Sequence, residues 1–197
     1  VYMVADSNTY AAAGEEVEKI LKEAGKHYRT CVLEGEVILP NPDTLGKIIL
    51  NASDPCAKPN IFAYSELPDF ILAVGSGTIN DSCRIASYRL NLPYGVVGTA
   101  PSMDGYASAG TPFLFNGSKA TIQCTTPKYI IGDLDILKEA PFEMMLAGIG
   151  DMFGKYIGIL DWELARDYSG EYFCDKIAKD VIDATNKCLE NGYELAK

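Results

Sequence analysis

The segment Leu72–Ser108, LAVGSGTINDSCRIASYRLNLPYGVVGTAPSMDGYAS, decides the fold of this chain. It opens within the unbroken apolar run Phe70–Val74, which is typical of a strand buried on both faces of a parallel sheet. The glycines of Gly75–Gly77 then permit a tight turn, and a second apolar strand follows at Tyr94–Val97. This order of strand, turn, helix and strand predicts one unit of a parallel α/β sheet.

The helix of this unit is predicted from apolar residues that recur at helical spacing between Ile79 and Leu90. We expect Thr78 or Asn80 to cap its start. The free N–H groups and the positive dipole end of such a helix, next to a glycine turn, favour an anion, most often a phosphate. The loop after the second strand lies at the same carboxyl edge, where open parallel sheets bind their ligands.

The glycine turn by itself is a weak signal for a dinucleotide. A G-x-G-x-x-G fingerprint needs a third glycine at position 80, where this chain has Asn80. No acidic residue follows at the distance expected for a contact with the ribose. Taken alone, Gly75–Gly77 is as consistent with a plain strand-to-helix turn as with a cofactor site.

The rest of the chain alternates strands and helices and then becomes helical. In chain order we expect a strand at 1–5, a helix at 14–24, a strand at 28–33, a helix capped by Asn41 with Pro42 first, a loop at 51–60, a hairpin that turns at Asn116-Gly117, a strand at 129–131, and helices from Pro141 onward. Asp6, which ends the first strand, either holds a cofactor ribose or caps a helix. We therefore predict an α/β, Rossmann-like parallel-sheet domain over residues 1–138 and the beginning of an all-α domain over residues 139–197.

The composition fits a globular protein of the cytoplasm. A net charge of −10 argues against nucleic acid as a partner, because phosphate backbones need clustered lysine and arginine. No apolar run reaches the roughly 18 residues of a membrane span, and the first residues do not form a signal peptide. The six cysteines contain no C-x-x-C pair and are expected to be reduced thiols. Because strand and helix patterns run up to the two ends, we expect an excerpt of a longer chain that lacks an N-terminal part.

Three motifs carry a resemblance to a known family: GSGTIND at 75–81, TAPSMDGYAS at 99–108 and AGIGDMFGKYIGILDWELA at 147–165. They resemble the sn-glycerol-1-phosphate dehydrogenases, which belong to the superfamily of iron-containing alcohol dehydrogenases, glycerol dehydrogenases and dehydroquinate synthases. The second motif is the most specific, because its ten positions agree with one branch of that superfamily. Arg84 departs from the pattern, in which a lysine is expected three residues after Asp81.

The resemblance implies a nicotinamide cofactor, NAD or NADP, whose pyrophosphate lies at the glycine turn. The cofactor residues that it implies come from the first and second motifs: Gly77, Thr78, Ile79, Asn80, Asp81, Thr99, Ala100, Pro101, Ser102 and Ser108. Glycines in the third motif, at positions 148, 150 and 154, would let the backbone approach cofactor and substrate closely.

The resemblance also implies one divalent metal, expected to be zinc, with Asp151 as a ligand and two histidines that would lie beyond residue 197. His27 is expected on the surface and not at the metal. Asp104 and Asp151 are the implied substrate residues, with Asp104 accepting a hydrogen bond from a substrate hydroxyl. From the residues alone, Asp151 is also consistent with a helix cap or an ion pair with Lys155, and Asp104 with a turn before Gly105.

The implied activity is the interconversion of dihydroxyacetone phosphate and sn-glycerol 1-phosphate, a step of phospholipid biosynthesis, by a homo-oligomer. The excerpt alone is expected to be inactive. Three alternatives stay open: a dehydroquinate synthase-like lyase, another polyol dehydrogenase of the superfamily, and a metal-free nucleotide-binding relative.

Overall fold

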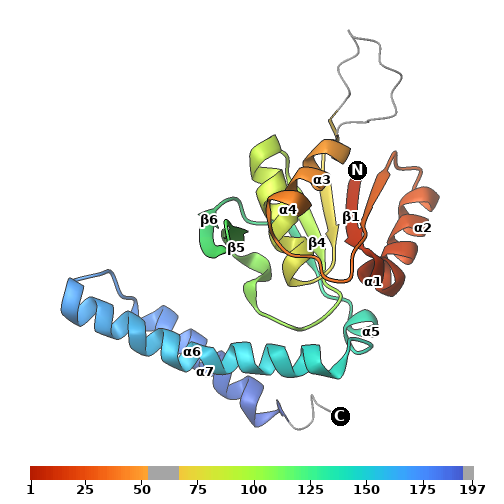
Figure 1. The fold of residues 1–197 in the computed structure, drawn as a ribbon. Coiled ribbons are helices and arrows are strands. Elements are labelled where there is room, and N and C mark those ends of the chain that lie inside the picture. Colours follow the sequence, from red (N-terminus) through yellow and green to blue (C-terminus); the bar gives the residue numbers. More distant parts are fainter. Residues whose placement is uncertain (53–66, 193–197) are drawn as a thin grey trace. The chain divides into compact units, whose positions relative to one another are not determined.

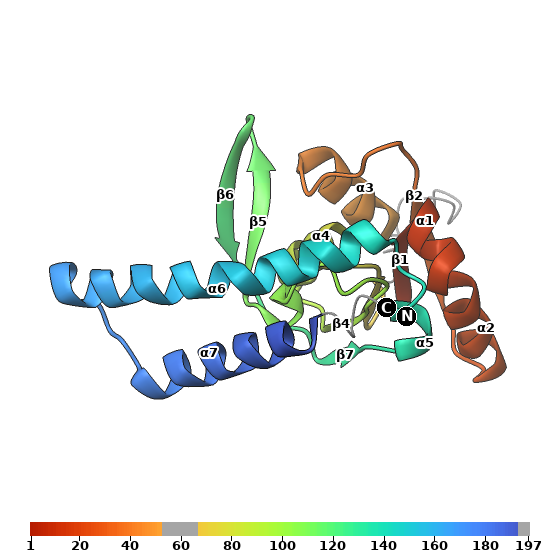
Figure 2. The same ribbon diagram turned by 90° about the horizontal axis from the view of Figure 1, so that it is seen from below.

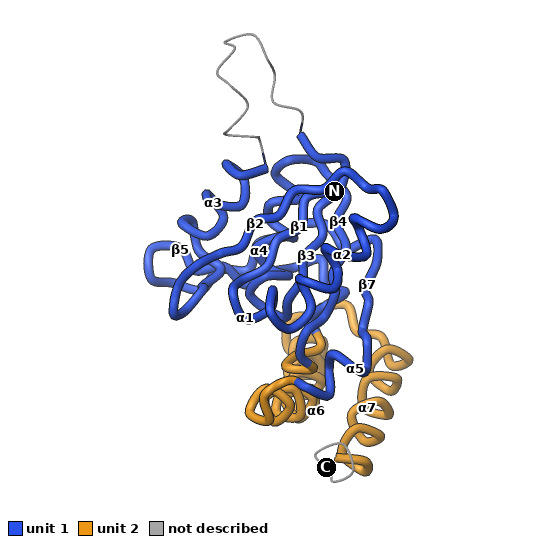
Figure 3. The backbone as a smooth tube through the Cα atoms, turned by 90° about the vertical axis from the view of Figure 1, so that its right-hand side faces the viewer, with its two compact units in different colours: residues 1–100, 105–139 blue, residues 101–104, 140–197 orange. Residues whose placement is uncertain are grey.

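The computed structural model describes residues 1–52 and 67–192, which form two compact units (Figure 3). Unit 1 contains residues 1–100 and 105–139. Unit 2 contains residues 101–104 and the residues from 140 onward. The loop expected at 51–60 falls from residue 53 onward outside the described residues.

Unit 1 is built on a parallel sheet of five strands in the order β2-β1-β3-β4-β7. The strands are β1 (Tyr2–Asp6), β2 (Arg29–Leu33), β3 (Ile71–Val74), β4 (Tyr94–Val97) and β7 (Tyr129–Ile131). All four neighbouring pairs run parallel, which confirms the predicted α/β class. Because β2 and β3 lie on opposite sides of β1, the sheet has its topological switch point between β1 and β3.

Helices cover both faces of this sheet (Figure 1). One face packs against α3 (Pro42–Ala52) and α4 (Gly77–Leu90). The other face is covered by the segment α1 (Ser7–Thr9), a π-helix (Tyr10–Gly14) and α2 (Glu15–Glu23), with α5 (Leu134–Leu137) beside it. Side chains of β1 alternate between the two cores, since Tyr2 and Val4 belong to the first and Met3 and Ala5 to the second.

Local capping explains where two of these helices begin. The Asn41 side chain accepts the Thr44 N–H at 2.9 Å, which confirms the predicted start of α3. Asp6 accepts two N–H groups of α1, so the capping alternative for this residue is present in the structure.

The predicted cap of α4 is wrong. Ser76 is the N-cap residue, and the Asn80 N–H already donates to the Ser76 carbonyl at 3.0 Å. Thr78 and Asn80 therefore lie inside the first turn and cannot precede it. The helix starts earlier than expected because Gly77 itself is helical.

The hairpin after the second motif forms a separate two-stranded sheet, β5 (Gly110–Phe115) and β6 (Ser118–Gln123). Asn116 and Gly117 both have positive φ, at 50° and 77°, which is the conformation that a tight two-residue turn requires. Figure 2 shows the hairpin projecting away from the main sheet, which it flanks and does not extend.

Unit 2 is a pair of helices, α6 (Phe142–Ser169) and α7 (Asp175–Glu190), that lie side by side (Figures 1 and 2). Gly170 ends α6 in the left-handed conformation, with φ of 69°. The Trp162 indole N–H donates to the Tyr172 carbonyl at 2.7 Å, and the rings of Trp162 and Phe173 lie 4.5 Å apart. In the part of the chain that the structure describes, no helix combines the length and apolar character needed to cross a bilayer.

Candidate functional site

The loops that follow β3 and β4 lie next to each other at the carboxyl edge of the sheet. Val74 and Val97 are paired in register at the ends of these strands, and the Gly75 N–H donates to the Val97 carbonyl at 3.0 Å. A Cβ atom added at Gly75 would lie 2.7 Å from the Ile79 Cβ, so the turn into α4 requires glycine here. The structure thus brings the first-motif residues beside Thr99 and Ala100.

The N-terminus of α4 has the features of an anion site. Ser76 makes no side-chain capping hydrogen bond, so the first-turn N–H groups stay available to a ligand. Asn80, in this first turn, is completely buried, and neither polar atom of its amide finds a partner among the described residues. Buried amides are normally paired, so this orphaned group is consistent with a bound ligand that supplies the partner.

Arg84 is a site residue whose role the sequence did not reveal. Its side chain is only 1% exposed, and its guanidinium donates to the Asp81 carboxylate at 2.8 Å and to the Tyr94 hydroxyl at 2.9 Å. It also donates to three backbone carbonyls of the segment that follows Asp104, those of Gly105, Tyr106 and Gly110, at 2.9, 3.2 and 3.1 Å. A planar group with five donors matches this set of acceptors, and a lysine ammonium does not. Through these hydrogen bonds, Arg84 connects residues 105–110 to α4.

Burial and the ion pair with Arg84 shift the pKa of Asp81 in opposite directions. Burial raises the pKa of the Asp81 carboxyl above its ordinary value, and the Thr111 hydroxyl and the Arg84 guanidinium oppose that rise. Burial also raises the pKa of Tyr94 to about 12, so its hydroxyl stays protonated while it accepts the Arg84 N–H. The positive charge of Arg84 offsets the cost of burying the Asp81 carboxylate.

Two further hydrogen bonds within unit 1 stabilise the segment that follows β4. The Tyr106 hydroxyl donates to the Ala100 carbonyl at 2.7 Å, and Tyr106 lies against Gly98, where an added Cβ would meet its hydroxyl oxygen at 3.2 Å. The exposed Ser108 hydroxyl donates to the Gly110 carbonyl at 2.7 Å. Thr99 and Ala100, the first residues of the second motif, are buried.

Unit 2 brings together the two predicted carboxylates, which are 47 residues apart in sequence. The backbone N–H of Asp104 donates to Oδ2 of Asp151 at 2.9 Å. Lys155 Nζ lies 3.0 Å from each carboxylate oxygen of Asp104 and 3.8 Å from Oδ1 of Asp151. The ion pair between Asp151 and Lys155, which the sequence offered as an alternative, is present. The shorter contact of Lys155 with Asp104 was not predicted.

The loop 101–104, which contains the predicted residues Pro101 and Ser102, lies against α6 at one glycine. A Cβ atom added at Gly148 would lie 1.9 Å from the Pro101 carbonyl oxygen, a distance at which no side chain fits. A Cβ atom added at Gly150 or Gly154 would have no neighbour within 4 Å among the described residues. Only Gly148 of these three thus has a close backbone neighbour within the described residues.

Asp151 fits a metal as a single carboxylate ligand. Its Oδ2 is held by the Asp104 N–H, and hydrogen-bonded carboxylates of this kind are usual in metal sites. Over residues 1–52 and 67–192, no group of three or more His, Cys, Asp or Glu side chains could hold an ion. His27 is exposed, as expected.

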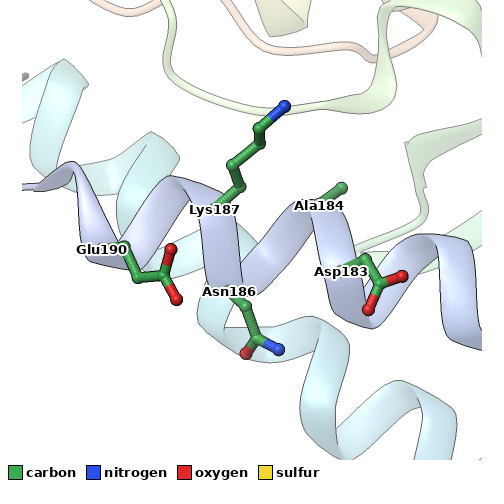
Figure 4. A pocket seen from close by; sticks show the side chains of 5 residues that line it. All are labelled: Asp183, Ala184, Asn186, Lys187 and Glu190. Carbon is green, nitrogen blue, oxygen red and sulfur yellow. The ribbon is translucent and has the colours of Figure 1, made fainter.

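Two hollows of the structure do not coincide with the predicted site residues. One, of about 540 Å³, lies along α7, and Figure 4 shows Lys187 pointing away from Asp183, Asn186 and Glu190, which also line it. Since a single helix supplies all of its lining residues, this hollow is an open depression.

The other hollow, of about 650 Å³, lies in unit 1 near the start of β4, opposite the carboxyl edge of the sheet. Its lining residues are Ser87, Tyr88, Asn91, Leu92, Pro93, Tyr94, Ala109, Cys124, Thr125, Thr126 and Lys128.

Comparison with known proteins decides the family. Residues 1–141 match the family model described as iron-containing alcohol dehydrogenase. The chain belongs to the iron-containing alcohol dehydrogenase family. This match covers the whole predicted sheet region, and the resemblance inferred from the three motifs is confirmed by the relatives that follow.

Two curated relatives are named glycerol-1-phosphate dehydrogenase (NAD(P)+). The protein from Halalkalibacterium halodurans is 37% identical over 199 aligned residues, which cover 100% of this chain and 47% of the relative. The protein from Bacillus subtilis is 36% identical over 197 residues, covering 100% of this chain and 48% of the relative. The chain thus spans about half the length of the curated relatives that it matches.

A solved structure shares the fold. The glycerol dehydrogenase of Schizosaccharomyces pombe is 22% identical, with a TM-score of 0.65 over 79% of this chain and 36% of that protein. At this identity the similarity supports the architecture alone.

Proposed function

We propose that this chain is part of an NAD(P)-dependent oxidoreductase that interconverts dihydroxyacetone phosphate and sn-glycerol 1-phosphate. The observation that carries the proposal is the similarity, over the whole chain, to proteins named glycerol-1-phosphate dehydrogenase. The hydrogen bond between Asp104 and Asp151 supports it, because both residues come from motifs that resemble those of that family. We further propose that the protein is a cytoplasmic homo-oligomer that serves phospholipid biosynthesis.

Unit 1 is the proposed dinucleotide-binding domain. The open N–H groups at the start of α4 and the unpartnered Asn80 amide suit the pyrophosphate of NAD or NADP. The proposed contacts are those of Gly77–Asp81 at the glycine turn and of Thr99, Ala100 and Ser108 on the second loop. Arg84 holds Asp81 and the 105–110 segment in place around them.

Unit 2 is the proposed beginning of the metal and substrate domain. Asp151 would supply one carboxylate ligand to a divalent ion, for which we propose zinc, and Pro101 and Ser102 would continue the cofactor contacts. When bound, such an ion acts as a Lewis acid toward a substrate oxygen. Hydride transfer belongs to the nicotinamide, and the residues of this chain position the groups that react.

The experiment uses the protein that carries this chain, with and without EDTA and added Zn²⁺. We expect oxidation of NADH or NADPH that depends on dihydroxyacetone phosphate and yields sn-glycerol 1-phosphate. Dihydroxyacetone without phosphate serves as the matched substrate control. Turnover of the unphosphorylated ketone in preference would identify another polyol dehydrogenase and contradict the proposal.

The two carboxylates have different proposed tasks, which two substitutions separate. Asp151→Asn should release the metal and abolish turnover, because it removes an anionic ligand. Asp104→Asn should keep the metal and weaken transition-state binding by about 1.5–3 kcal/mol, the scale of a hydrogen bond to a charged group. Elemental analysis beside steady-state kinetics measures both effects. Metal loss from the Asp104 variant alone would reverse the two assignments.

A further inference from the structure

A stripe on one face of α6 supports the loop that carries Asp104. Residues 148, 151 and 155 follow one another at helical spacing of three and four, so they share this face. Gly148 lies against the Pro101 carbonyl, Asp151 accepts the Asp104 N–H, and Lys155 contacts the Asp104 carboxylate. The loop is thereby held at its first residue and at its last.

We propose that Lys155 is a positioning residue of the site, which holds Asp104 so that its backbone N–H orients Asp151. This inference rests on the proposed function, in which Asp104 meets the substrate and Asp151 the metal. Lys155 itself touches neither.

The distances identify Asp104 as the main partner of Lys155. The ammonium lies 3.0 Å from both oxygens of Asp104 and 3.8 Å from the nearest oxygen of Asp151. A lysine that served only as the intrahelical partner of Asp151 would lie closer to that residue, four positions away on the same helix. The side chain of Lys155 is 29% exposed, so solvent screens this pair less than it screens the exposed ion pairs of α7.

Fixing Asp104 has a direct consequence for Asp151. Oδ2 of Asp151 is engaged by the Asp104 N–H, while Oδ1 has only the longer contact with Lys155. Asp151 would hold a divalent cation through its carboxylate, and the hydrogen bond on Oδ2 would limit rotation of that carboxylate. Hydrogen-bond partners that orient a metal ligand commonly change metal affinity or activity by about 10- to 100-fold.

The charge of the cluster suits the ligands proposed for it. Before a metal binds, two carboxylates and one ammonium leave one net negative charge, which favours a divalent cation or a hydroxyl donor. Lys155 pairs with both carboxylates of the cluster, as a positioning residue should.

Amide hydrogen exchange at Asp104 tests the positioning directly and needs no activity. Lys155→Met keeps most of the length of the side chain and removes its charge, and we expect the Asp104 N–H to exchange roughly tenfold faster, as for the loss of one hydrogen bond. Lys155→Arg should restore protection, because a guanidinium also pairs with a carboxylate. The matched control is Lys176→Met on α7, where the lysine is 86% exposed and lies 3.5 Å from Asp180. Unchanged exchange in Lys155→Met would overturn the proposal.

Kinetics of the same variants in the protein that carries this chain separate positioning from general destabilisation. We expect Lys155→Met to raise KM for dihydroxyacetone phosphate about tenfold and to leave KM for the nicotinamide cofactor unchanged, with recovery in Lys155→Arg. A rise in both constants together, without faster Asp104 exchange, would overturn the inference. If the unsubstituted protein does not turn over the phosphorylated ketone, the proposed function fails, and the exchange experiment still decides the role of Lys155.

Discussion

Arg84 is a charged side chain that lies wholly inside the protein and meets only acceptors. Its partners are one carboxylate, one hydroxyl and three carbonyls, so each of its nitrogens donates. Removing one member of a buried ion pair strands the other charge, which is more damaging than replacing both. Arg84 also links the start of α4 to residues 105–110. Its loss should therefore both lower the free energy of unfolding and displace a segment of the proposed cofactor site.

Substitution of Arg84 tests this role at the level of stability. Arg84→Met should lower the free energy of unfolding by about 3–5 kcal/mol, because Asp81 is left buried without its partner. Arg84→Lys should recover only part of that loss, since one ammonium cannot reach five acceptors. Urea unfolding of the chain measures the change. Arg89→Met, an exposed arginine of the same helix, is the control and should change the free energy by less than about 0.5 kcal/mol; an equal loss there would contradict the assignment.

The thiols of Cys83 and Cys174 should differ sharply in reactivity. Complete burial raises the pKa of the Cys83 thiol, whereas a hydrogen bond from the backbone N–H of Ile177 lowers the pKa of the Cys174 thiol at the start of α7. Because the thiolate is the nucleophile, iodoacetamide at pH 8 should modify Cys174 at least about 100-fold faster than Cys83. Peptide mass spectrometry of the native chain measures both rates. Similar rates would mean that α4 opens readily.

On the scale of secondary-structure elements, α6 shows how one helix combines a packed face with open ones. Of its glycines at 148, 150 and 154, only the first meets another backbone, and the helix has no residue that is fully buried. Glycine lowers helix stability, so its presence in a long helix calls for a packing reason. The structure supplies that reason at Gly148.

Alanine at these positions should have opposite effects. Gly148→Ala should lower the free energy of unfolding of unit 2 by about 1–3 kcal/mol or displace the 101–104 loop, because its Cβ would overlap the Pro101 carbonyl. Gly154→Ala meets nothing and should raise helix stability by up to about 1 kcal/mol. Thermal unfolding followed by circular dichroism compares the two variants. A loss of stability at both positions would show that packing at Gly148 is not the cause.

On the scale of the molecule, the two units differ in how their apolar residues are used. Unit 1 buries two clusters against the faces of one sheet. In unit 2, α6 has no fully buried residue and α7 has two, Ala178 and Thr185. Local opening should therefore require less free energy in unit 2 than in unit 1.

Hydrogen exchange of the 197-residue chain tests this difference. Amides of α6 and α7 should exchange at least about 100-fold faster than those of β1, β3 and β4, because the helices have few buried contacts to hold them closed. Mass spectrometry of proteolytic peptides resolves the two sets, with the exposed helix α2 as an internal reference in unit 1. Equal protection of helices and central strands would show that the chain opens as one cooperative body.

Most of the architecture was predictable because its signals are local. Apolar runs, helical spacing and the turn at Asn116-Gly117 each act over a few residues, and the five parallel strands, the hairpin and the long helix α6 follow from them. The cap of α4 was predicted wrongly, since several polar residues in one stretch suit a helix start equally well and the end of β3 decides which is used. Asp104 and Asp151 were predicted from motifs, and their roles remain predictions.

Only the tertiary structure decided which residues meet. Arg84 finds its carbonyl acceptors 21 to 26 residues away, and Lys155 finds Asp104 at a separation of 51. Nothing in the local pattern specifies such pairs, because they depend on how loops return to a helix after the core has formed. The sequence by itself therefore determined the elements, the parallel sheet and the family, and packing determined the partners of each charge, since a contact between distant residues is set by the whole fold.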